Sequence, residues 1–530
     1  MKRNNLELRK TLLGLAMLLV LLIISTAWIA EPEKVIIYLK DSAILDEAEN
    51  YSDKPVSPNT SARKPGETIS VIPEILDSIG QRLLSYPDKE LSIAWIIDDS
   101  GSMKDERKII SNEIDNFMSV LNNKKILNMA VVGFGEKARI CCELTRDSKM
   151  IKKGIMDVGN EGSGIENCMA AIEYSIKTVI NATGKRVLIL VTDETGDDTD
   201  RLEQIIPRLK NKDIAVYVLG RESSFIHPEA PDNNGIESAD PELLVESKYV
   251  ESDYSPVPFY LPTDIRYYIK SGFPPYALAR ICKETKGYYY FLKDSIYDKE
   301  IMKLYKPDLC SVEEYRTMNQ KDKLRSVIMG ITYKQNSLFS HYYNTNTNDF
   351  WCNDASNFFE TPLIPKKGLI QATKSLPIIN DCIKQLETAI SSDLMKTANK
   401  RWIANAELMM AQLYRVAFLL DQYVLTLDEW IKSKDFFNPP LAVETSTNYN
   451  EYYYIGQDTD APIRKGSDAK DYKNLAEQSL EKVILNHPGT PWSVVAWAYK
   501  KEGMYGYKVF RINPKKENNL DKKLIPPKKH

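Results

Sequence analysis

The sequence predicts an α/β protein: an open, doubly wound, mostly parallel sheet with an antiparallel edge strand, followed by a mainly α-helical C-terminal region. Three short, continuous apolar runs, at 91–97, 186–191 and 214–220, are typical of strands buried on both faces of a parallel sheet. Stretches with helical spacing separate these runs, which is the alternation of an α/β fold. The runs at 129–135 and 138–144 lie so close together that only a hairpin can join them, so one edge pair is antiparallel.

Residues 1–30 are predicted to be a signal peptide or an N-terminal membrane anchor. Four of the first ten residues are basic, and an apolar run over 11–30 follows them. A helix needs roughly 20 residues to span a bilayer, which this run provides, while small residues at 25–27 offer a cleavage site. Both interpretations place the rest of the chain outside the cytoplasm, in the periplasm or at the cell surface, because basic residues stay on the cytoplasmic side.

Residues 31–90 are interpreted as a lead-in to the sheet. They contain a short apolar strand at 35–38 and a linker rich in Pro, Ser, Asn and Thr at 51–69. The α/β domain is expected over 91–295. Its helices are predicted from apolar spacing near 104–122, 165–183, 200–211 and 276–286.

The C-terminal half is predicted to be mainly helical. Residues 296–365 are rich in Tyr and Asn and are interpreted as an irregular connector. Residues 366–511 are expected to form a helical domain, because apolar residues between Ile403 and Val424 recur at helical spacing. The Lys- and Pro-rich residues 512–530 are predicted to be a disordered basic tail, and no partner is assigned to it.

A helical hairpin is predicted near the end of this helical domain. Gly489 stands where a helix end favours a left-handed residue, Thr490 can cap the next helix, and Pro491 suits its first position. The hairpin resembles one tetratricopeptide-like unit. A single unit cannot bury its own apolar face, so we expect it to pack on the preceding helices rather than bind a peptide.

The composition argues against several function classes. The formal net charge is −3 over 530 residues, so no global field points to nucleic acid as a partner. The seven cysteines show no zinc spacing, and Cys310 with Cys352 is the first pair to consider for a disulfide after export. Only four histidines occur, without an HExxH, Gly-x-Ser-x-Gly or phosphate-loop motif, so the sequence predicts a protein that is not an enzyme.

The stretch IAWIIDDSGSM, residues 93–103, carries polar side chains to the end of a buried strand. Asp98 is expected to be the first residue past that strand. Asp98, Ser100 and Ser102 alternate, so in an extended loop their side chains can point the same way. One carboxylate and two hydroxyls are the oxygen ligands that a hard cation such as Mg²⁺ prefers.

Two further loops are predicted to complete this cation site. The run LILVTDETGDD delivers Asp193 to the end of its strand, and a glycine-rich loop places Ser163 just before a helix. In an open α/β sheet, ligands bind beyond the carboxyl ends of the strands. The sequence therefore predicts five metal ligands from three loops, with Ser163 the weakest of them.

These motifs make residues 91–295 similar to a von Willebrand factor A domain, a Rossmann-like fold with a metal-ion-dependent adhesion site. The family's D-x-S-x-S resembles Asp98 to Ser102, its distal aspartate resembles Asp193, and its threonine is replaced by Ser163. Together with the late HPGTPW, the chain resembles a group of exported bacterial proteins with this domain. The resemblance implies a bound Mg²⁺ (or Mn²⁺ or Ca²⁺) whose coordination is completed by a carboxylate of a protein partner. Asp99 and Glu194, next to the ligands, can either support them from behind or form a solvated rim, and the rim is the preferred interpretation.

One connection within the domain is unusually long for such a fold. Residues 221–273 carry ten acidic and four basic side chains and are interpreted as an acidic insertion. Because the insertion leaves its strand at the edge where the metal is expected, one of its carboxylates can cap the cation, or the segment can select a partner. A solvated loop is the equally weighted alternative.

The resulting hypothesis is a non-enzymatic, metal-dependent protein-binding module, exposed outside the cytoplasm and held to the membrane by its N-terminal segment. The alternative is a structural assembly or chaperone-like scaffold in which the metal is optional. A chelator separates the two, because only the first loses its partner when the metal is removed. The sequence indicates no oligomeric state.

Overall fold

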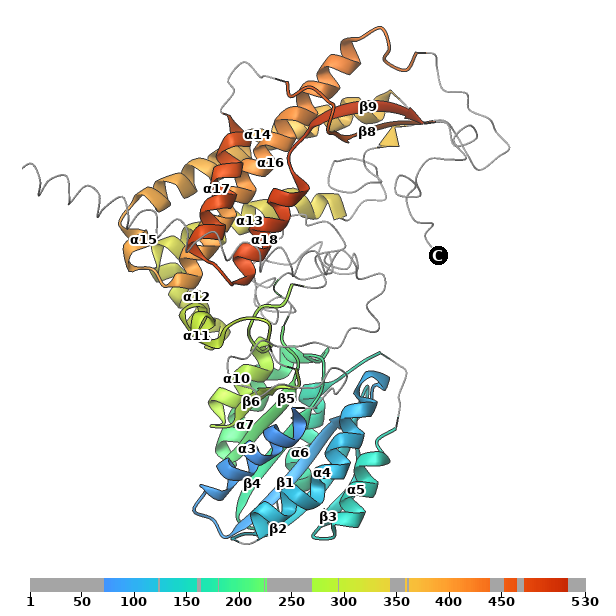
Figure 1. The fold of residues 1–530 in the computed structure, drawn as a ribbon, viewed down its shortest axis with the longest axis vertical. Helices are drawn as coiled ribbons and strands as arrows, with labels where there is room; N and C mark the ends of the chain where they lie inside the picture. Colours follow the sequence, from blue (N-terminus) through green and yellow to red (C-terminus); the bar gives the residue numbers. More distant parts are fainter. Residues whose placement is uncertain are drawn as a thin grey trace, which may run out of the picture. The chain divides into compact units, whose positions relative to one another are not determined.

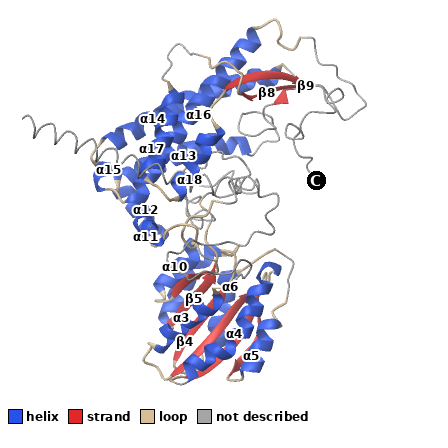
Figure 2. Cartoon of the chain, viewed as in Figure 1, coloured by secondary structure: helices blue, strands red, loops and turns tan. Residues whose placement is uncertain are grey.

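The computed structural model describes the chain from residue 71 to residue 512 with gaps (Figures 1 and 2). The described ranges are 71–122, 124–159, 164–179, 181–223, 225, 269–293, 295–343, 358–359, 362–438, 452–464 and 471–512. The expected export segment, the strand at 35–38 and the basic tail from 513 lie outside them. Among the described helices, none is both long and apolar enough to cross a membrane.

The central sheet has six strands in the order β3-β2-β1-β4-β5-β6. Every neighbouring pair is parallel except β2 and β3, which form the predicted antiparallel edge. The sheet places the carboxyl ends of β1, β4 and β5 side by side, because Ile97 pairs with Val191 and Val191 with Leu219. The strands are β1 Glu90–Asp98, β2 Ile126–Phe134, β3 Arg139–Thr145, β4 Lys185–Val191, β5 Ile214–Gly220 and β6 Tyr288–Phe291.

Helices cover both faces of the sheet, which confirms the predicted doubly wound α/β class. Alternate residues of β1 enter two different cores: Trp95 packs with α3, α4 and α5, whereas Ile96 packs with α6, α7 and α10. Strands buried on both faces need continuous apolar runs, which is the pattern that the sequence shows. The helices are α3 Ile72–Leu84, α4 Lys104–Asn122, α5 Ser148–Met156, α6 Cys168–Val179, α7 Leu202–Asn211 and α10 Tyr276–Glu284.

Helix α3 corrects the interpretation of 31–90 as a lead-in alone. Its apolar residues are buried in the core that it shares with β1 and α4. They recur three, four, seven and eleven positions after Ile72, which is the helical period. The residues are Ile72, Ile75, Leu76, Ile79 and Leu83.

Helices α12 and α13 likewise correct the expectation of an irregular connector at 296–365. Ser311 and Glu314 form a reciprocal capping box that starts α12. In α13, Leu324, Ile328 and Ile331 lie one turn apart and are fully buried in the helical core. The described elements of this segment include α11 Lys299–Met302, α12 Val312–Lys321, α13 Lys323–Tyr343 and the two-residue strand β7 Phe358–Phe359.

The C-terminal region is mainly helical, as predicted, with a small antiparallel sheet in the order β7-β8-β9. The hairpin turn has the predicted chemistry: Gly489 has φ 66°, Thr490 caps α18, and Pro491 opens it. This hairpin packs on α16. The elements are α14 Leu363–Ser391, α15 Leu394–Thr397, α16 Lys400–Lys432, β8 Tyr452–Asp458, α17 Tyr472–Asn486, α18 Pro491–Glu502 and β9 Gly506–Ile512.

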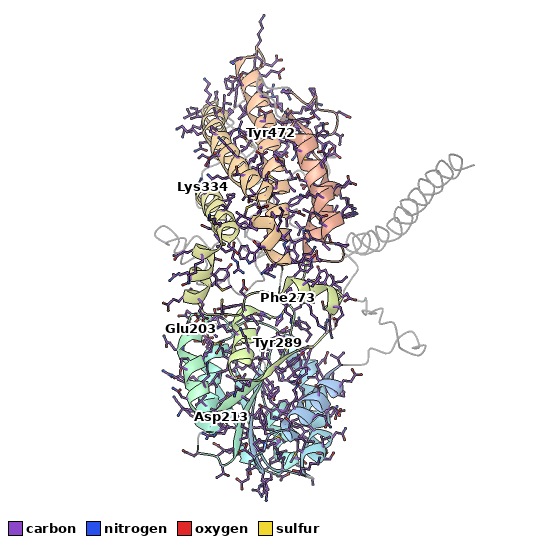
Figure 3. The ribbon with its side chains drawn as sticks, turned by 90° about the vertical axis from the view of Figure 1, so that its left-hand side faces the viewer. Glu203, Asp213, Phe273, Tyr289, Lys334 and Tyr472 are labelled. Carbon is purple, nitrogen blue, oxygen red and sulfur yellow. The ribbon has the colours of Figure 1, made fainter. Side chains whose placement is uncertain are left out.

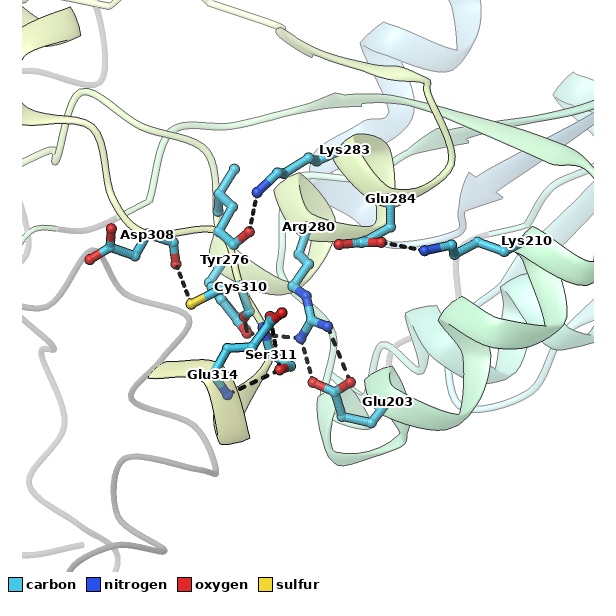
Figure 4. A network of polar contacts seen from close by, with 11 residues as sticks. Glu203, Lys210, Tyr276, Arg280, Lys283, Glu284, Asp308, Cys310, Ser311 and Glu314 are labelled. Atoms are coloured by element: carbon cyan, nitrogen blue, oxygen red, sulfur yellow. Dashed lines mark hydrogen bonds and ion pairs between the residues drawn. The ribbon is translucent and has the colours of Figure 1, made fainter. Parts of the chain in front are cut away.

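A polar network on α10 connects the sheet domain to the segment that leads into the helices (Figure 4). Arg280 forms an ion pair with Glu203 of α7 and donates to the Tyr276 hydroxyl at 3.0 Å. That hydroxyl in turn donates to the carbonyl of Cys310. Cys310 is a free thiol, and Cys352, its suggested disulfide partner, lies outside the described residues.

Candidate functional site at the carboxyl edge of the sheet

The loop after β1 is an ordered turn held by Asp98. Asp98 is fully buried and is the last residue of β1, so the strand ends one position later than predicted. Its Oδ1 accepts a hydrogen bond from the Ser100 amide at 2.8 Å. The Ser100 and Ser102 hydroxyl oxygens lie 3.0 Å apart, as predicted, but residues Gly101–Met103 form a 3-10 helix rather than the expected extended loop.

Arg107 of α4 fixes the backbone of this loop, and the sequence interpretation missed it. Its Nη1 donates to the carbonyl oxygens of Asp98 and Ser100, both at 2.8 Å. The side chain is buried, and burial lowers the pKa of its guanidinium. The available signal was its position: Arg107 is in phase with the buried Ile110 and Ile114, where an apolar residue would be expected.

The loop after β4 meets the loop after β1. The Thr192 hydroxyl donates to Asp98 Oδ2 at 2.8 Å, and Asp193 follows directly. Burial raises the pKa of Asp98 above its usual range, although hydrogen bonds from Ser100 and Thr192 oppose the shift, and the Asp193 charge adds to it. The structure therefore brings the two predicted carboxylates to one edge of the sheet.

Asp193 is the ligand candidate with an unused oxygen. Its side chain is 7% exposed, and its Oδ2 pairs with Arg221 Nη2 at 2.9 Å. Its Oδ1 is buried and has no hydrogen-bond partner. A buried carboxylate oxygen without a donor is costly, so this atom is a natural place for a cation or an ordered water.

Ser163, the fifth predicted ligand, lies outside the described residues. The described end of its loop is tied to the loop after β4 by two hydrogen bonds between Glu166 and Asp197. The Glu166 amide donates to Asp197 Oδ2 at 3.1 Å, and the Asp197 amide donates to the Glu166 carbonyl at 2.7 Å. Glu166, on the described side of this loop, thus lies beside the loop after β4.

Two acidic neighbours of the ligands differ from each other. Asp99 is buried and accepts a hydrogen bond from Arg139 Nη1 at 2.7 Å, which corrects its interpretation as a solvated rim residue. Glu194 is exposed, as interpreted, and a hydrogen bond joins it to Glu166. Burial, and then the charge of Glu194, raise the pKa of Glu166 well above its usual range. Several acidic side chains therefore meet at this edge of the sheet, and Glu166 binds a proton more readily than an isolated carboxyl group does.

The donor set fits a hard divalent cation of the magnesium type. Two carboxylates and two hydroxyls belong to the described residues, and one carboxylate oxygen is left without a partner. Among the described residues, no three His, Cys, Asp or Glu side chains are grouped to hold a metal. The set here depends instead on hydroxyl ligands and on two acids, a combination suited to a cation that keeps some of its waters.

Comparison with known proteins agrees with this geometry. Residues 93–196 match the von Willebrand factor type A domain family. Comparison with curated proteins finds no match.

Solved structures from three bacteria resemble part of the chain. BatB from Bacteroides thetaiotaomicron is 16% identical over 43% of this chain and 99% of its own, with a TM-score of 0.24. An aerotolerance-related membrane protein from Bacteroides fragilis is 16% identical over 39% and 93%, with a TM-score of 0.23. The pilus tip protein Mfa5 from Porphyromonas gingivalis is 14% identical over 23% and 26%, with a TM-score of 0.18. At these values the assignment depends on the match at 93–196.

Proposed function

Because residues 93–196 form a von Willebrand factor type A domain, we propose that the chain is a non-enzymatic interaction module that binds a protein partner through a divalent cation. The observation that carries the proposal is the meeting of two strand-end loops at one edge of the sheet. There Thr192 joins Asp98 to the loop of Asp193, and Asp193 keeps one buried oxygen without a partner.

The residues that would hold the cation are Asp98, Ser100, Ser102 and Asp193, with Ser163 as the fifth. Mg²⁺ is the preferred ion, and Mn²⁺ or Ca²⁺ suits the same oxygen ligands. A cation held largely by hydroxyls keeps much of its positive charge, so it supplies a binding point for a carboxylate of the partner. Arg107 maintains the loop in the conformation that presents both serine hydroxyls.

The described residues support a binding role over catalysis. The only histidine with a described side chain, His487, is buried in the helical region between Tyr305 and Glu407. The Ser100 hydroxyl contacts Ser102, so no base activates it among the contacts described. We propose on this ground that the protein is not an enzyme.

The proposed location is outside the cytoplasm, with the N-terminal segment as anchor or cleaved signal. The support is the basic flank and the apolar run over 11–30. The related structure from Bacteroides fragilis is described as that of a membrane protein.

A scaffold in which the metal is optional is the second candidate, and one contact favours it. Arg221 forms an ion pair with Asp193, and this pair can balance the charge of the buried carboxylate in place of a metal. Under this alternative, partner binding persists when divalent ions are removed.

Direct metal binding tests the proposal. We expect the full chain in detergent to bind Mn²⁺ in titration calorimetry, and Asp193→Asn to weaken binding by about tenfold or more. Asp381→Asn, an exposed helical carboxylate far along the chain, is the control and should bind as the wild type does.

Partner capture then separates the two candidates. Membranes are incubated with the tagged chain in Mg²⁺ or in chelator, beside an Asp98→Ala variant. An interaction module loses its partner in chelator and in the variant. A partner retained under both conditions would favour the scaffold, and absence of Mn²⁺ binding would contradict the metal site itself.

A further inference from the structure

Arg221 stands at the base of the acidic insertion and contacts the metal site. We propose that Arg221 is a built-in counter-cation, which pairs with Asp193 in the absence of a divalent ion and must release Asp193 when the ion binds. This inference rests on the proposed function, because it assigns a regulatory contact to the same site. Of the acidic residues of the insertion, all but Glu222 lie outside the described residues, so the sequence-based hypothesis that one of their carboxylates caps the metal stays a prediction.

The first support is the ion pair itself. Arg221 Nη2 lies 2.9 Å from Asp193 Oδ2, and the Asp193 side chain is 7% exposed. A cation that binds the free Oδ1 would be held on the same carboxylate as the guanidinium, where the two positive charges repel. The Arg221 side chain is 37% exposed, so it has a route to solvent when it is displaced.

The second support is that the backbone of Arg221 is held in place. The Tyr289 hydroxyl of β6 donates to the Arg221 carbonyl at 2.7 Å (Figure 3 labels Tyr289). The preceding residue, Gly220, leaves room for this contact, because a Cβ there would lie 2.1 Å from the Tyr289 hydroxyl oxygen. The position of Arg221 opposite Asp193 is thus determined by the sheet.

The third support is the pairing of the two limbs of the insertion base, 221–225 and 269–273. The Ser223 amide donates to the Phe273 carbonyl at 2.9 Å, and the Ser271 amide donates to the Ser223 carbonyl at 2.9 Å. The two serine hydroxyls are 2.6 Å apart and buried. Arg221 is the first residue of this base. A change in its ion pair with Asp193 therefore occurs next to a segment that is held by hydrogen bonds.

The paired limbs continue into the core of the helical region. Phe225 packs edge-on against Trp492 of α18, with ring centroids 4.9 Å apart. The guanidinium of Arg401 lies over the rings of both Phe273 and Trp492. These contacts connect the insertion base to the start of α18, so any shift of the base on release of Arg221 would reach the helical region.

The test compares Mn²⁺ affinity of the full chain in detergent for wild type and Arg221→Gln. Without the counter-cation, the ion no longer has to break an ion pair, so the variant should bind Mn²⁺ between about threefold and tenfold more tightly. In chelator the variant should melt at a lower temperature than wild type, because the buried Asp193 charge is left unpaired. The rise in melting temperature on adding Mn²⁺ should be larger in the variant.

Lys293→Gln is the matched control for charge. Lys293 is exposed and close enough to influence Lys270 at the same insertion base, so its removal changes the net charge equally without touching Asp193. We expect its affinity to stay within about twofold of wild type. An equal gain in Mn²⁺ affinity in both variants would show a general effect of net charge and would overturn the proposal. Unchanged or weaker Mn²⁺ binding in Arg221→Gln would also overturn it.

The outcomes also separate this inference from the proposed function. Mn²⁺ binding by wild type with no gain in Arg221→Gln overturns the counter-cation and leaves the metal site intact. Absence of binding in both proteins overturns both. Binding by the variant alone would contradict the proposed function of the wild type and would also overturn a counter-cation that the ion displaces.

Hydrogen exchange tests the transmission step. Mn²⁺ should speed exchange of the amides of Ser223 and Phe225, which donate across the insertion base, in wild type. In Arg221→Gln, exchange at these amides should be insensitive to Mn²⁺. Equal protection with and without the ion in wild type would contradict the coupling.

Discussion

At the residue scale, the site is organised by basic side chains as much as by its acids. Arg107 binds the carbonyls of the first loop, Arg139 neutralises the buried Asp99, and Arg221 neutralises Asp193. Without basic partners, each carboxylate at this edge would raise the free-energy cost of burying the other carboxylates nearby. The arginines thus allow a negatively charged edge to form before any cation binds.

Arg107→Ala should destabilise the protein by about 2–3 kcal/mol, because two buried carbonyls lose a charged donor. It should also weaken Mn²⁺ binding, since the serine hydroxyls are no longer held in register. Urea denaturation and calorimetry measure the two effects. Arg107→Lys keeps a charged donor and should recover part of the stability and part of the Mn²⁺ affinity. If Arg107→Ala kept the full stability and the full Mn²⁺ affinity of wild type, this role of Arg107 would be contradicted.

At the element scale, the carboxyl ends of three parallel strands create the site. Asp98 ends β1, Thr192 and Asp193 follow β4, and Arg221 follows β5. Parallel pairing brings these ends together regardless of their separation in the chain. The last residue of β5, Gly220, permits β6 to approach closely through Tyr289.

Gly220→Ala should cost about 1–3 kcal/mol of stability, because the new Cβ overlaps the Tyr289 hydroxyl and forces strand movement. The change should also loosen Arg221, whose carbonyl accepts from that hydroxyl. Thermal unfolding in chelator measures the loss. Adding Tyr289→Phe removes the hydroxyl oxygen that the new Cβ would meet, so the double variant should regain part of the stability. If the double variant instead loses as much stability as the two single variants together, the overlap is not the cause.

At the scale of the whole described chain, buried polar contacts connect distant segments of the helical region. His487, in the turn between α17 and α18, contacts the Tyr305 hydroxyl at 3.0 Å and Glu407 of α16 at 3.1 Å. Asn486 donates to the same carboxylate at 2.9 Å. Burial alone would raise the pKa of Glu407, but the hydrogen bonds from His487 and Asn486 prevail and lower it.

This lowered pKa predicts an acid-sensitive helical region. A carboxyl whose pKa is lower in the folded state stabilises that state above its unfolded pKa and loses this contribution as the pH falls through its folded pKa. We expect the midpoint of urea denaturation to fall between pH 6 and pH 3 (about the range that brackets a carboxyl group), and the fall to be smaller in Glu407→Gln. Asp381→Asn, whose ion pair with Lys334 is exposed and screened, should leave the pH dependence nearly unchanged.

Local patterns in the sequence determined the strands, the doubly wound sheet, the hairpin turn at Gly489 and the joint direction of Ser100 and Ser102. These features depend on residues close together in the chain, so apolar periodicity and turn chemistry reveal them. The sequences of α3 and α13 show the same apolar periodicity, although no helix was predicted for either segment.

Only the tertiary structure decided which side chains serve the site. Thr192 reaches Asp98 across 94 positions, and Arg221 belongs to an insertion whose acidic composition suggested the opposite charge at the metal site. Periodicity specifies which face of an element a residue occupies. It does not specify which distant polar group lies across from that face, because that depends on strand order and on the packing of helices over the sheet.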